Sequence, residues 1–136
     1  MVRIEVDYQG QLRCRALHVT SGCELLTDAP VDNHGKGEAH SPTDLLAAGL
    51  GTCMLTVMGI RADKGGYSIA DSTVGVEKHM TTTGPRRVAR LVAKVAIPAR
   101  SLTEAQKQEL VHAALNCPVK LSLHEAIDID VSFDWL

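Results

Sequence analysis

Four cysteine side chains are the most reactive groups in this sequence, and they stand at positions 14, 23, 53 and 117. No CxxC or HxxxH pattern is present, so the spacing does not predict a zinc site. The first residues lack the basic and then apolar order of a signal peptide, and we therefore expect a cytoplasmic protein with reduced thiols. Paired cysteines in such a compartment are commonly redox-active or metal-binding.

Cys117 directly precedes Pro118, and proline is favoured at the first position of a helix. The sequence therefore predicts a short helix over residues 118–125 with Cys117 at its N-cap. Free N–H groups at a helix N-terminus favour negative charge, so this place is expected to lower the pKa of the thiol. We expect Cys117 to be a functional thiol.

Cys53 lies about three turns inside a longer predicted helix, beyond the useful range of the helix dipole. Its thiolate therefore requires a cation from another segment of the chain. Gly49 stands one turn earlier, and because helical side chains lean toward the N-terminus, this glycine leaves open space over the sulfur. The alternative is that Cys53 is a small core residue, since free cysteine is often buried. Cys14 and Cys23, in predicted strands, are expected to be structural.

The helix that carries Cys53 has clear start and stop signals. Ser41, Pro42 and Asp44 supply an N-cap, a proline at the first helical position and an acid three residues after the cap. Two glycines at 65–66 end it. Residues 45–60 are apolar nearly all round, so the helix is expected to be wrapped on most sides. This apolar stretch is shorter than the roughly 20 residues of a membrane span, which favours a core helix.

Alternating apolar and polar residues predict strands on both sides of this helix. The predicted elements outside the long helix are strands over residues 2–8, 11–19, 23–27, 67–80, 86–97 and 127–135, and a helix from about 103 to 115. The first three strands are expected to form a meander, with residues 2–8 half-buried. The order βββαββααβ describes one α+β domain over residues 1–136.

Composition excludes several classes of function. The 14 basic and 16 acidic residues include no basic run longer than Arg86-Arg87, so nucleic-acid binding is not expected. No membrane association is expected either. With 45% apolar but only 3% aromatic residues, one chain has little material to cover a long apolar helix. We therefore expect a homodimer.

The sequence resembles the OsmC/Ohr family of thiol-dependent hydroperoxide reductases, in particular its OsmC-like subgroup. The resemblance rests on HSPTDLLAAGLGTCM at residues 40–54, on NCPV at 116–119 and on IDIDV at 127–131. It implies a long buried central helix wrapped by antiparallel sheets in an intertwined dimer. It also implies two active sites at the dimer interface and no cofactor.

The resemblance further implies a role for each thiol. Cys53 matches the peroxidatic cysteine, which attacks the O–O bond of an organic hydroperoxide and becomes a sulfenic acid. Cys117 matches the resolving cysteine, which condenses with that sulfenic acid to a disulfide. An external dithiol then reduces the disulfide by exchange.

Two features of the family's site are left open by this sequence. Arg13 and Arg15 both stand in the region where the family supplies an arginine for the thiolate, and spacing does not choose between them. Thr43 stands where the family has a glutamate that orients this arginine. Glu38 and Asp44 are the candidates to replace it.

Further candidates would line the substrate site. His40 directly precedes the cap of the long helix, near the loop that leads into the site. Met54 and Met58 stand at helical spacing, where a thioether wall would suit an apolar peroxide, although this spacing is more typical of a core.

Three functions therefore remain open at this point. The favoured one is a thiol peroxidase for organic hydroperoxides. The absent glutamate supports a second, a non-peroxidase protein that binds small apolar ligands. The third is a metal-binding protein that uses Cys53, Cys117 and His40. The separation of the two sulfurs distinguishes these functions.

Overall fold

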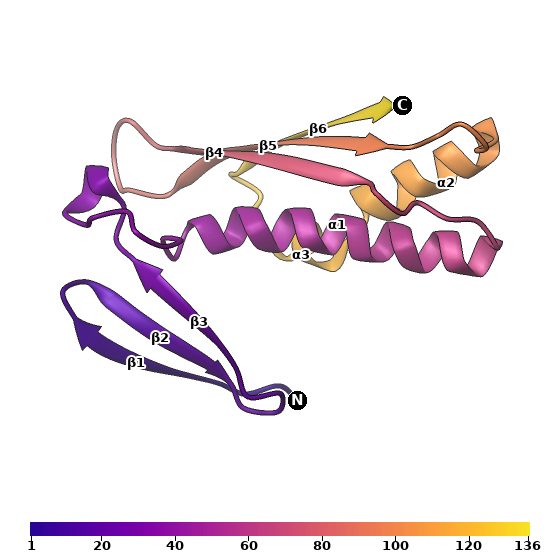
Figure 1. Cartoon of the computed structure of the whole chain (residues 1–136). Coiled ribbons are helices and arrows are strands. Elements are labelled where there is room, and N and C mark those ends of the chain that lie inside the picture. Colours follow the sequence, from indigo (N-terminus) through magenta and orange to yellow (C-terminus); the bar gives the residue numbers. More distant parts are fainter. The chain divides into compact units, whose positions relative to one another are not determined.

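The computed structural model describes residues 1–136 (Figure 1). Contacts group the chain into two compact units, residues 1–46 and 47–136, and the boundary falls in the first turn of α1 (Asp44–Gly65). The first unit holds three strands, and the second holds nearly all of the helical structure and the other three strands. That the chain forms a single domain stays a prediction.

The first unit is the expected meander. Strands β1 (Ile4–Gly10), β2 (Arg13–His18) and β3 (Cys23–Asp28) form an antiparallel sheet in that order. Gly22, at a φ of 73°, makes the turn between β2 and β3, where the left-handed conformation favours glycine. A short 3-10 helix, η1 (Val31–Asn33), interrupts the long loop that follows.

The apolar side chains of β1 are exposed rather than half-buried. Val6 is 62% exposed and Tyr8 is 67% exposed, and Ile4 is exposed beside them. The expectation of a half-buried strand is therefore wrong for the single chain, because alternation marks an apolar face but does not say which element covers it. An exposed apolar face of this kind on β1 is available for contact with a second chain.

Helix α1 begins as the sequence predicts. The Asp44 N–H donates to Ser41 Oγ at 3.1 Å, and the Ser41 N–H donates to the Asp44 carboxylate at 2.8 Å. These reciprocal bonds satisfy backbone donors that a helix start would leave unpaired. At the other end, Gly66 has a φ of 71° and ends the helix as expected.

Helix α1 has 22 residues and is long and apolar enough to cross a membrane by length and composition alone. One of its faces instead packs in the protein core. The buried residues of this face are Ala47, Leu50, Gly51, Met54, Met58 and Ala62. On the remaining surface Ile60 is 50% exposed, so the single chain does not wrap the helix on most sides.

The second unit contains a sheet of β4 (Thr73–Met80), β5 (Val88–Ile97) and β6 (Asp128–Trp135), in that order. β4 and β5 are antiparallel, whereas β6 runs parallel to β5. The antiparallel pairing implied by the resemblance thus holds for every strand pair except the last. A parallel neighbour requires a crossover, which the helical segment between β5 and β6 supplies.

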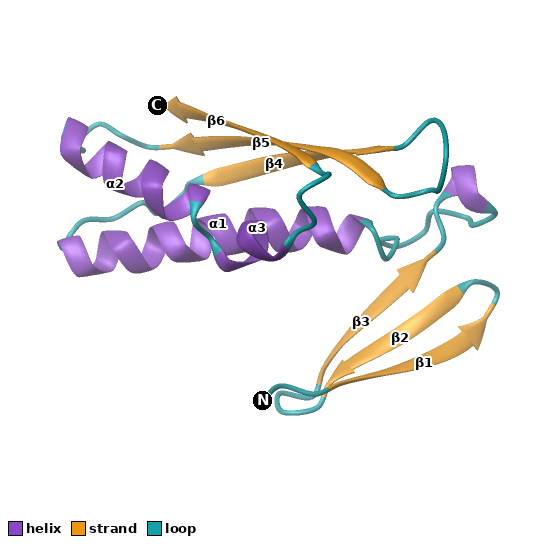
Figure 2. Ribbon diagram, turned by 180° about the vertical axis from the view of Figure 1, so that it is seen from behind, coloured by secondary structure: helices purple, strands orange, loops and turns teal.

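That crossover consists of α2 (Glu104–Leu115) and α3 (Pro118–Ser122). Figures 1 and 2 view the molecule from opposite sides, and both show α1 running alongside β4, β5 and β6. The core lies between them and is built from aliphatic and thioether side chains rather than aromatic ones. Its fully buried members include Leu50, Met54, Met58, Leu91, Val95, Ile97 and Leu110. The expected α+β fold is confirmed.

The start of α2 provides a test of local stability. The Gln106 N–H donates to Thr103 Oγ1 at 3.2 Å, and the Thr103 N–H donates to Gln106 Oε1 at 2.9 Å. Thr103→Ala removes the cap acceptor and is expected to lower the free energy of unfolding by about 1 kcal/mol. Gln106→Ala, which keeps that acceptor, should cost less. Denaturant unfolding followed by circular dichroism measures both, and an unchanged Thr103→Ala midpoint would contradict the assignment.

Candidate active site

Cys53 and Cys117 meet in the second unit. The two side chains are close enough for Cys53 to raise the pKa of Cys117, Cys53 packs against the core cluster that contains Cys117, and both are free thiols. Cys53 comes from α1, while Cys117 comes from the junction between α2 and α3. Two neighbouring thiols can form a disulfide if the backbone brings their Cα atoms within about 7 Å of each other. Closing that bond would release two electrons and two protons to an oxidant.

Cys117 occupies the predicted N-cap of α3. Pro118 follows at the first helical position, and the Lys120 N–H donates to Cys117 Sγ at 3.4 Å. Asn116 ends α2 just before it, with its Nδ2 donating to the His112 carbonyl at 2.8 Å. These two caps fix the backbone on both sides of the thiol. The Cys117 side chain is 0% exposed and belongs to the core.

Burial raises the pKa of the Cys117 thiol above its ordinary value. The N–H groups of Lys120 and Val119 act in the opposite direction, and the neighbouring Cys53 raises the pKa further. The expectation of a lowered pKa is therefore wrong. The reason is that α3 has only five residues and its N-cap lies inside the core, where removal from water outweighs the helix N-terminus.

This direction predicts how stability depends on pH. The unfolded chain gives up the Cys117 proton more readily than the folded one, so the thiol stabilises the fold below its ordinary pKa of 9.0 and this contribution is lost as pH rises above it. The free energy of unfolding of the reduced protein should fall more steeply above pH 9 than that of Cys117→Ala. Once the pH exceeds both the folded and the unfolded pKa of Cys117, the parent should have lost about 1.4 kcal/mol more than Cys117→Ala for each unit between those two pKa values.

Denaturant unfolding between pH 8 and pH 10.5 measures this difference. Cys23→Ala is the matched control, because Cys23 is exposed and its removal should leave the slope unchanged. Parallel slopes for the parent and Cys117→Ala would contradict the prediction.

Cys53 is only partly buried, and the glycines around it have different surroundings. A Cβ built on Gly49 would have no neighbour within 4 Å, which agrees with the predicted open space one turn before Cys53. A Cβ on Gly51 would lie 3.0 Å from Val74 and 3.1 Å from Val76. Gly51 therefore allows α1 to approach the sheet closely, while Gly49 leaves a surface open beside the thiol.

The other candidate lining residues have different places. Met54 and Met58 are both fully buried in the core, so neither presents a thioether wall to a substrate in this chain. His40 belongs to the first unit and is exposed. Its carbonyl accepts the Asp28 N–H at 3.1 Å, which ties the end of the long loop to β3.

Arg13, in the first unit, is held by two carboxylates. It pairs with Glu38 from the long loop and lies 3.5 Å from Asp28. Asp28 is 1% exposed, and its Oδ2 accepts the Glu38 N–H at 3.0 Å while its Oδ1 has no partner. These three side chains, with Cys14, line a cavity of about 190 Å³. The cluster connects β2 and β3 to the loop that precedes α1.

Arg15 is engaged differently. Its guanidinium bonds Asp7 on β1 at 2.6 Å and Glu24 on β3 at 3.0 Å. These are cross-strand ion pairs within the sheet, and their charged groups are substantially exposed. Arg15 thus joins three strands, whereas Arg13 joins the sheet to the loop. Sequence spacing could not make this distinction.

The two candidate replacements for the family's glutamate, Glu38 and Asp44, have different partners in the structure. Thr43 stands at that position, with its Oγ1 3.2 Å from Ser41 Oγ at the start of α1. The Asp44 carboxylate accepts the Ser41 N–H in the helix cap, whereas the Glu38 carboxylate pairs with Arg13. Glu38 is therefore the acid that holds an arginine.

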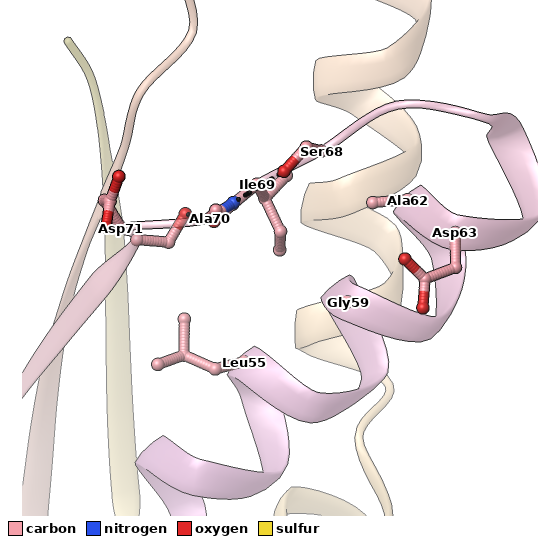
Figure 3. Close-up of a pocket in the computed structure, with 9 residues that line it drawn as sticks. Leu55, Gly59, Ala62, Asp63, Ser68, Ile69, Ala70 and Asp71 are labelled. Atoms are coloured by element: carbon pink, nitrogen blue, oxygen red, sulfur yellow. Dashed lines mark hydrogen bonds between the residues drawn. The ribbon is translucent and has the colours of Figure 1, made fainter.

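Sequence reasoning missed a second cavity, of about 330 Å³, in the second unit. Figure 3 shows its lining, with Leu55, Gly59, Ala62 and Asp63 on α1 facing residues 68–71 of the following segment. Neither Cys53 nor Cys117 lines it. The sequence signal that could have indicated this hollow is the glycine at position 59, inside the long helix, and in the structure a Cβ built there would meet nothing within 4 Å.

No group of three or more His, Cys, Asp or Glu side chains within either unit could hold a metal ion. Cys53 and Cys117 thus have no third ligand of this kind beside them in the second unit.

The chain is thus an α+β protein with a two-cysteine site. Helix α1 carries one thiol, and the α2–α3 junction places the second thiol next to it. A family model described as OsmC-like protein matches residues 35–132. The chain therefore belongs to the OsmC/Ohr family, as its sequence motifs predict. A comparison with curated protein sequences gave no match.

Solved structures agree with this assignment. The chain is 44% identical to a protein from Psychrobacter arcticus 273-4 described as an osmotic stress induced and detoxification response protein, with a TM-score of 0.90 over 98% of this chain and 96% of that one. An organic hydroperoxide resistance protein OsmC from Legionella pneumophila has 19% identity and a TM-score of 0.77, covering 98% and 96%. OhrB of Bacillus subtilis, an organic hydroperoxide resistance protein, has 17% identity and a TM-score of 0.71, covering 98% of each chain. The last two show the shared fold.

Proposed function

We propose that this protein is a thiol-dependent peroxidase that reduces organic hydroperoxides. The observation that carries the proposal is the neighbouring pair of Cys53 and Cys117, in which one thiol is partly exposed and the other fully buried. An exposed thiol can meet a peroxide, and a buried partner in contact with it can capture the oxidised product. Two structural relatives named for organic hydroperoxide resistance support this reading.

In the first step the Cys53 thiolate attacks one oxygen of the hydroperoxide ROOH. The O–O bond breaks, Cys53 becomes a sulfenic acid, and the leaving alkoxide takes a proton to give the alcohol ROH. In the second step Cys117 attacks the Cys53 sulfur, the S–O bond breaks, and water leaves with the proton of the thiol. The products are one disulfide, one alcohol and one water. A dithiol then restores both thiols and is itself oxidised to a disulfide.

The first step needs a thiolate, and Cys53 lies too far inside α1 for the helix N-terminus to favour one. We propose that Arg13 supplies the positive charge and that Glu38 takes the place of the family's glutamate. The ion pair between these two side chains supports the assignment, since it links the arginine to the loop that leads into α1. Arg15 would then stabilise the sheet through its cross-strand ion pairs rather than stabilise the thiolate.

The test counts thiols in the reduced protein after one equivalent of cumene hydroperoxide. A Cys14→Ser, Cys23→Ser background removes the two other thiols and leaves only the proposed pair. We expect both remaining thiols to be lost for each peroxide consumed, with a Cys53 to Cys117 linkage in the tryptic map. If both thiols stay free, the peroxidase proposal fails and a small-ligand-binding protein becomes the better reading.

We further propose that the active form is a homodimer in the reducing environment of the cytoplasm. The exposed apolar side chains of β1 and the exposed Ile60 of α1 support the dimer, because monomers rarely leave so many large apolar groups uncovered. In the OsmC/Ohr fold this would place each site at the interface between two copies.

The dimer gives a testable prediction on β1. Val6→Asp should change little in a monomer, because Val6 is largely exposed, but it should disrupt a dimer that covers this face. Glu5→Ala, on the opposite face of the same strand, is the control and should leave the assembly intact. Sedimentation velocity at micromolar concentration measures both variants. A folded monomer for the parent protein would contradict the proposal.

A further inference from the structure

The two sulfurs of the thiol pair differ in what can reach them. Cys117 is 0% exposed and packs in the core, with its sulfur held by the Lys120 N–H at 3.4 Å. Cys53 is partly exposed, and Gly49 leaves open space one turn before it on α1. Helical side chains lean toward the N-terminus, so the open space lies on the side toward which the Cys53 sulfur points.

We infer that the external thiol that reduces the Cys53 to Cys117 disulfide attacks the Cys53 sulfur only, so that Cys117 is always the leaving group. The inference rests on the proposed function for its biological meaning, but its chemistry concerns only the disulfide. A thiolate must approach the sulfur it attacks along the S–S axis, from the side opposite the leaving sulfur. Cys53 is partly exposed, so an external thiol can reach its sulfur from solvent, whereas Cys117 is fully buried and its sulfur can be reached only through the core.

Reduction of the disulfide by a dithiol takes place in two exchange steps. The thiolate of an alkyl dithiol forms a new S–S bond to Cys53, and the Cys53 to Cys117 bond breaks, with its electron pair leaving on the Cys117 sulfur. The Lys120 N–H already donates to that sulfur and stays in place to receive the charge. The second thiolate of the same molecule then attacks its own sulfur in the mixed disulfide, releases Cys53 and leaves as a cyclic disulfide. The dithiol is oxidised and the protein gains two electrons.

Trapping the mixed disulfide tests the inference directly. The disulfide is made with diamide in the Cys14→Ser, Cys23→Ser background, so the test does not depend on any peroxide reaction. The oxidised protein is treated briefly with the monothiol 2-mercaptoethanol, and an excess of N-ethylmaleimide is then added, which consumes the remaining mercaptoethanol and traps the released protein thiol. Peptide mass spectrometry is expected to place the mercaptoethanol on Cys53 and the maleimide on Cys117. The reverse labelling, or an even mixture, would overturn the inference.

A second measurement compares how accessible the two sulfurs are in the folded protein. In the same background, Cys117→Ser leaves only Cys53 and Cys53→Ser leaves only Cys117. Reaction with an aromatic disulfide such as dithionitrobenzoate should be at least about tenfold slower for the Cys117 sulfur, since a core thiol reacts only after local opening. In denaturant the two rates should become similar. Equal rates in the folded state would overturn the inference.

The two experiments also separate this inference from the proposed function. If the peroxide leaves both thiols free while the diamide disulfide is still opened at Cys53, the peroxidase proposal fails and the inference stands. If the peroxide forms the disulfide but the adduct appears on Cys117, the function stands and the inference fails.

Discussion

Replacing Cys53 with Ser is expected to reduce hydroperoxide consumption to the background rate, a loss of at least about a thousandfold, because the attacking nucleophile is gone. The substitution changes one atom in a partly buried position and should leave the fold intact. Stopped-flow or ferrous-xylenol measurement of cumene hydroperoxide gives the rate. Cys23→Ser is the matched control and should keep the parent rate. Peroxide consumption at the parent rate by Cys53→Ser would contradict the assignment of the nucleophile.

Cys117→Ser should separate the two chemical steps. The first oxidation of Cys53 should still occur, because its thiol is unchanged, but no internal disulfide can form. The sulfenic acid then persists and is oxidised further to sulfinic acid by excess peroxide. Activity should therefore decline with each turnover, and mass spectrometry should show two added oxygens on the Cys53 peptide. A stable activity without over-oxidation would mean that another group captures the sulfenic acid.

The second large effect is expected at Arg13. Removing its charge with Arg13→Gln should slow oxidation of Cys53 by roughly ten- to a thousandfold at neutral pH if Arg13 stabilises the thiolate as proposed, since a cation beside a thiol commonly changes the thiolate fraction to this extent. Arg15→Gln is the matched control, because Arg15 is also held by two carboxylates but within the sheet. Its rate should remain within a few-fold of the parent.

The thiolate absorbance near 240 nm and the rate of iodoacetamide alkylation at Cys53 report the charge effect independently of peroxide. Circular dichroism checks that both variants fold. If Arg15→Gln is the slower variant, the assignment of the two arginines is reversed. If both react like the parent, the thiolate is stabilised by another group.

Local signals in the sequence account for most of the fold. The cap formed by Ser41 and Asp44, the glycine stop of α1 and the proline after Cys117 each act within a few residues, and each appears in the structure as predicted. The parallel pairing of β5 and β6 could not be predicted from such local signals. Strand direction depends on the path of the chain between the two strands, which no local pattern encodes.

The candidate site was only partly predictable for the same reason. The motifs around Cys53 and Cys117 predicted these two thiols as the candidate pair, and the structure places them near each other, but the pKa direction of Cys117 depended on burial by distant core residues. The proposed choice of Arg13 over Arg15 depends on partners that are remote in sequence, Glu38 for one and Asp7 for the other. The methionines were candidates for a pocket, and the packing of α1 on the sheet placed them in the core.

The parallel pairing of β6 with β5 also has a consequence for folding kinetics. The β4–β5 hairpin closes a short loop, whereas β6 can pair with β5 only after residues 98–127 have been ordered, and long-range closure of this kind is slow. Cys117 lies in that late-closing segment. In a newly made chain Cys53 and Cys117 would thus remain apart until this segment is ordered, after the β4–β5 hairpin has formed.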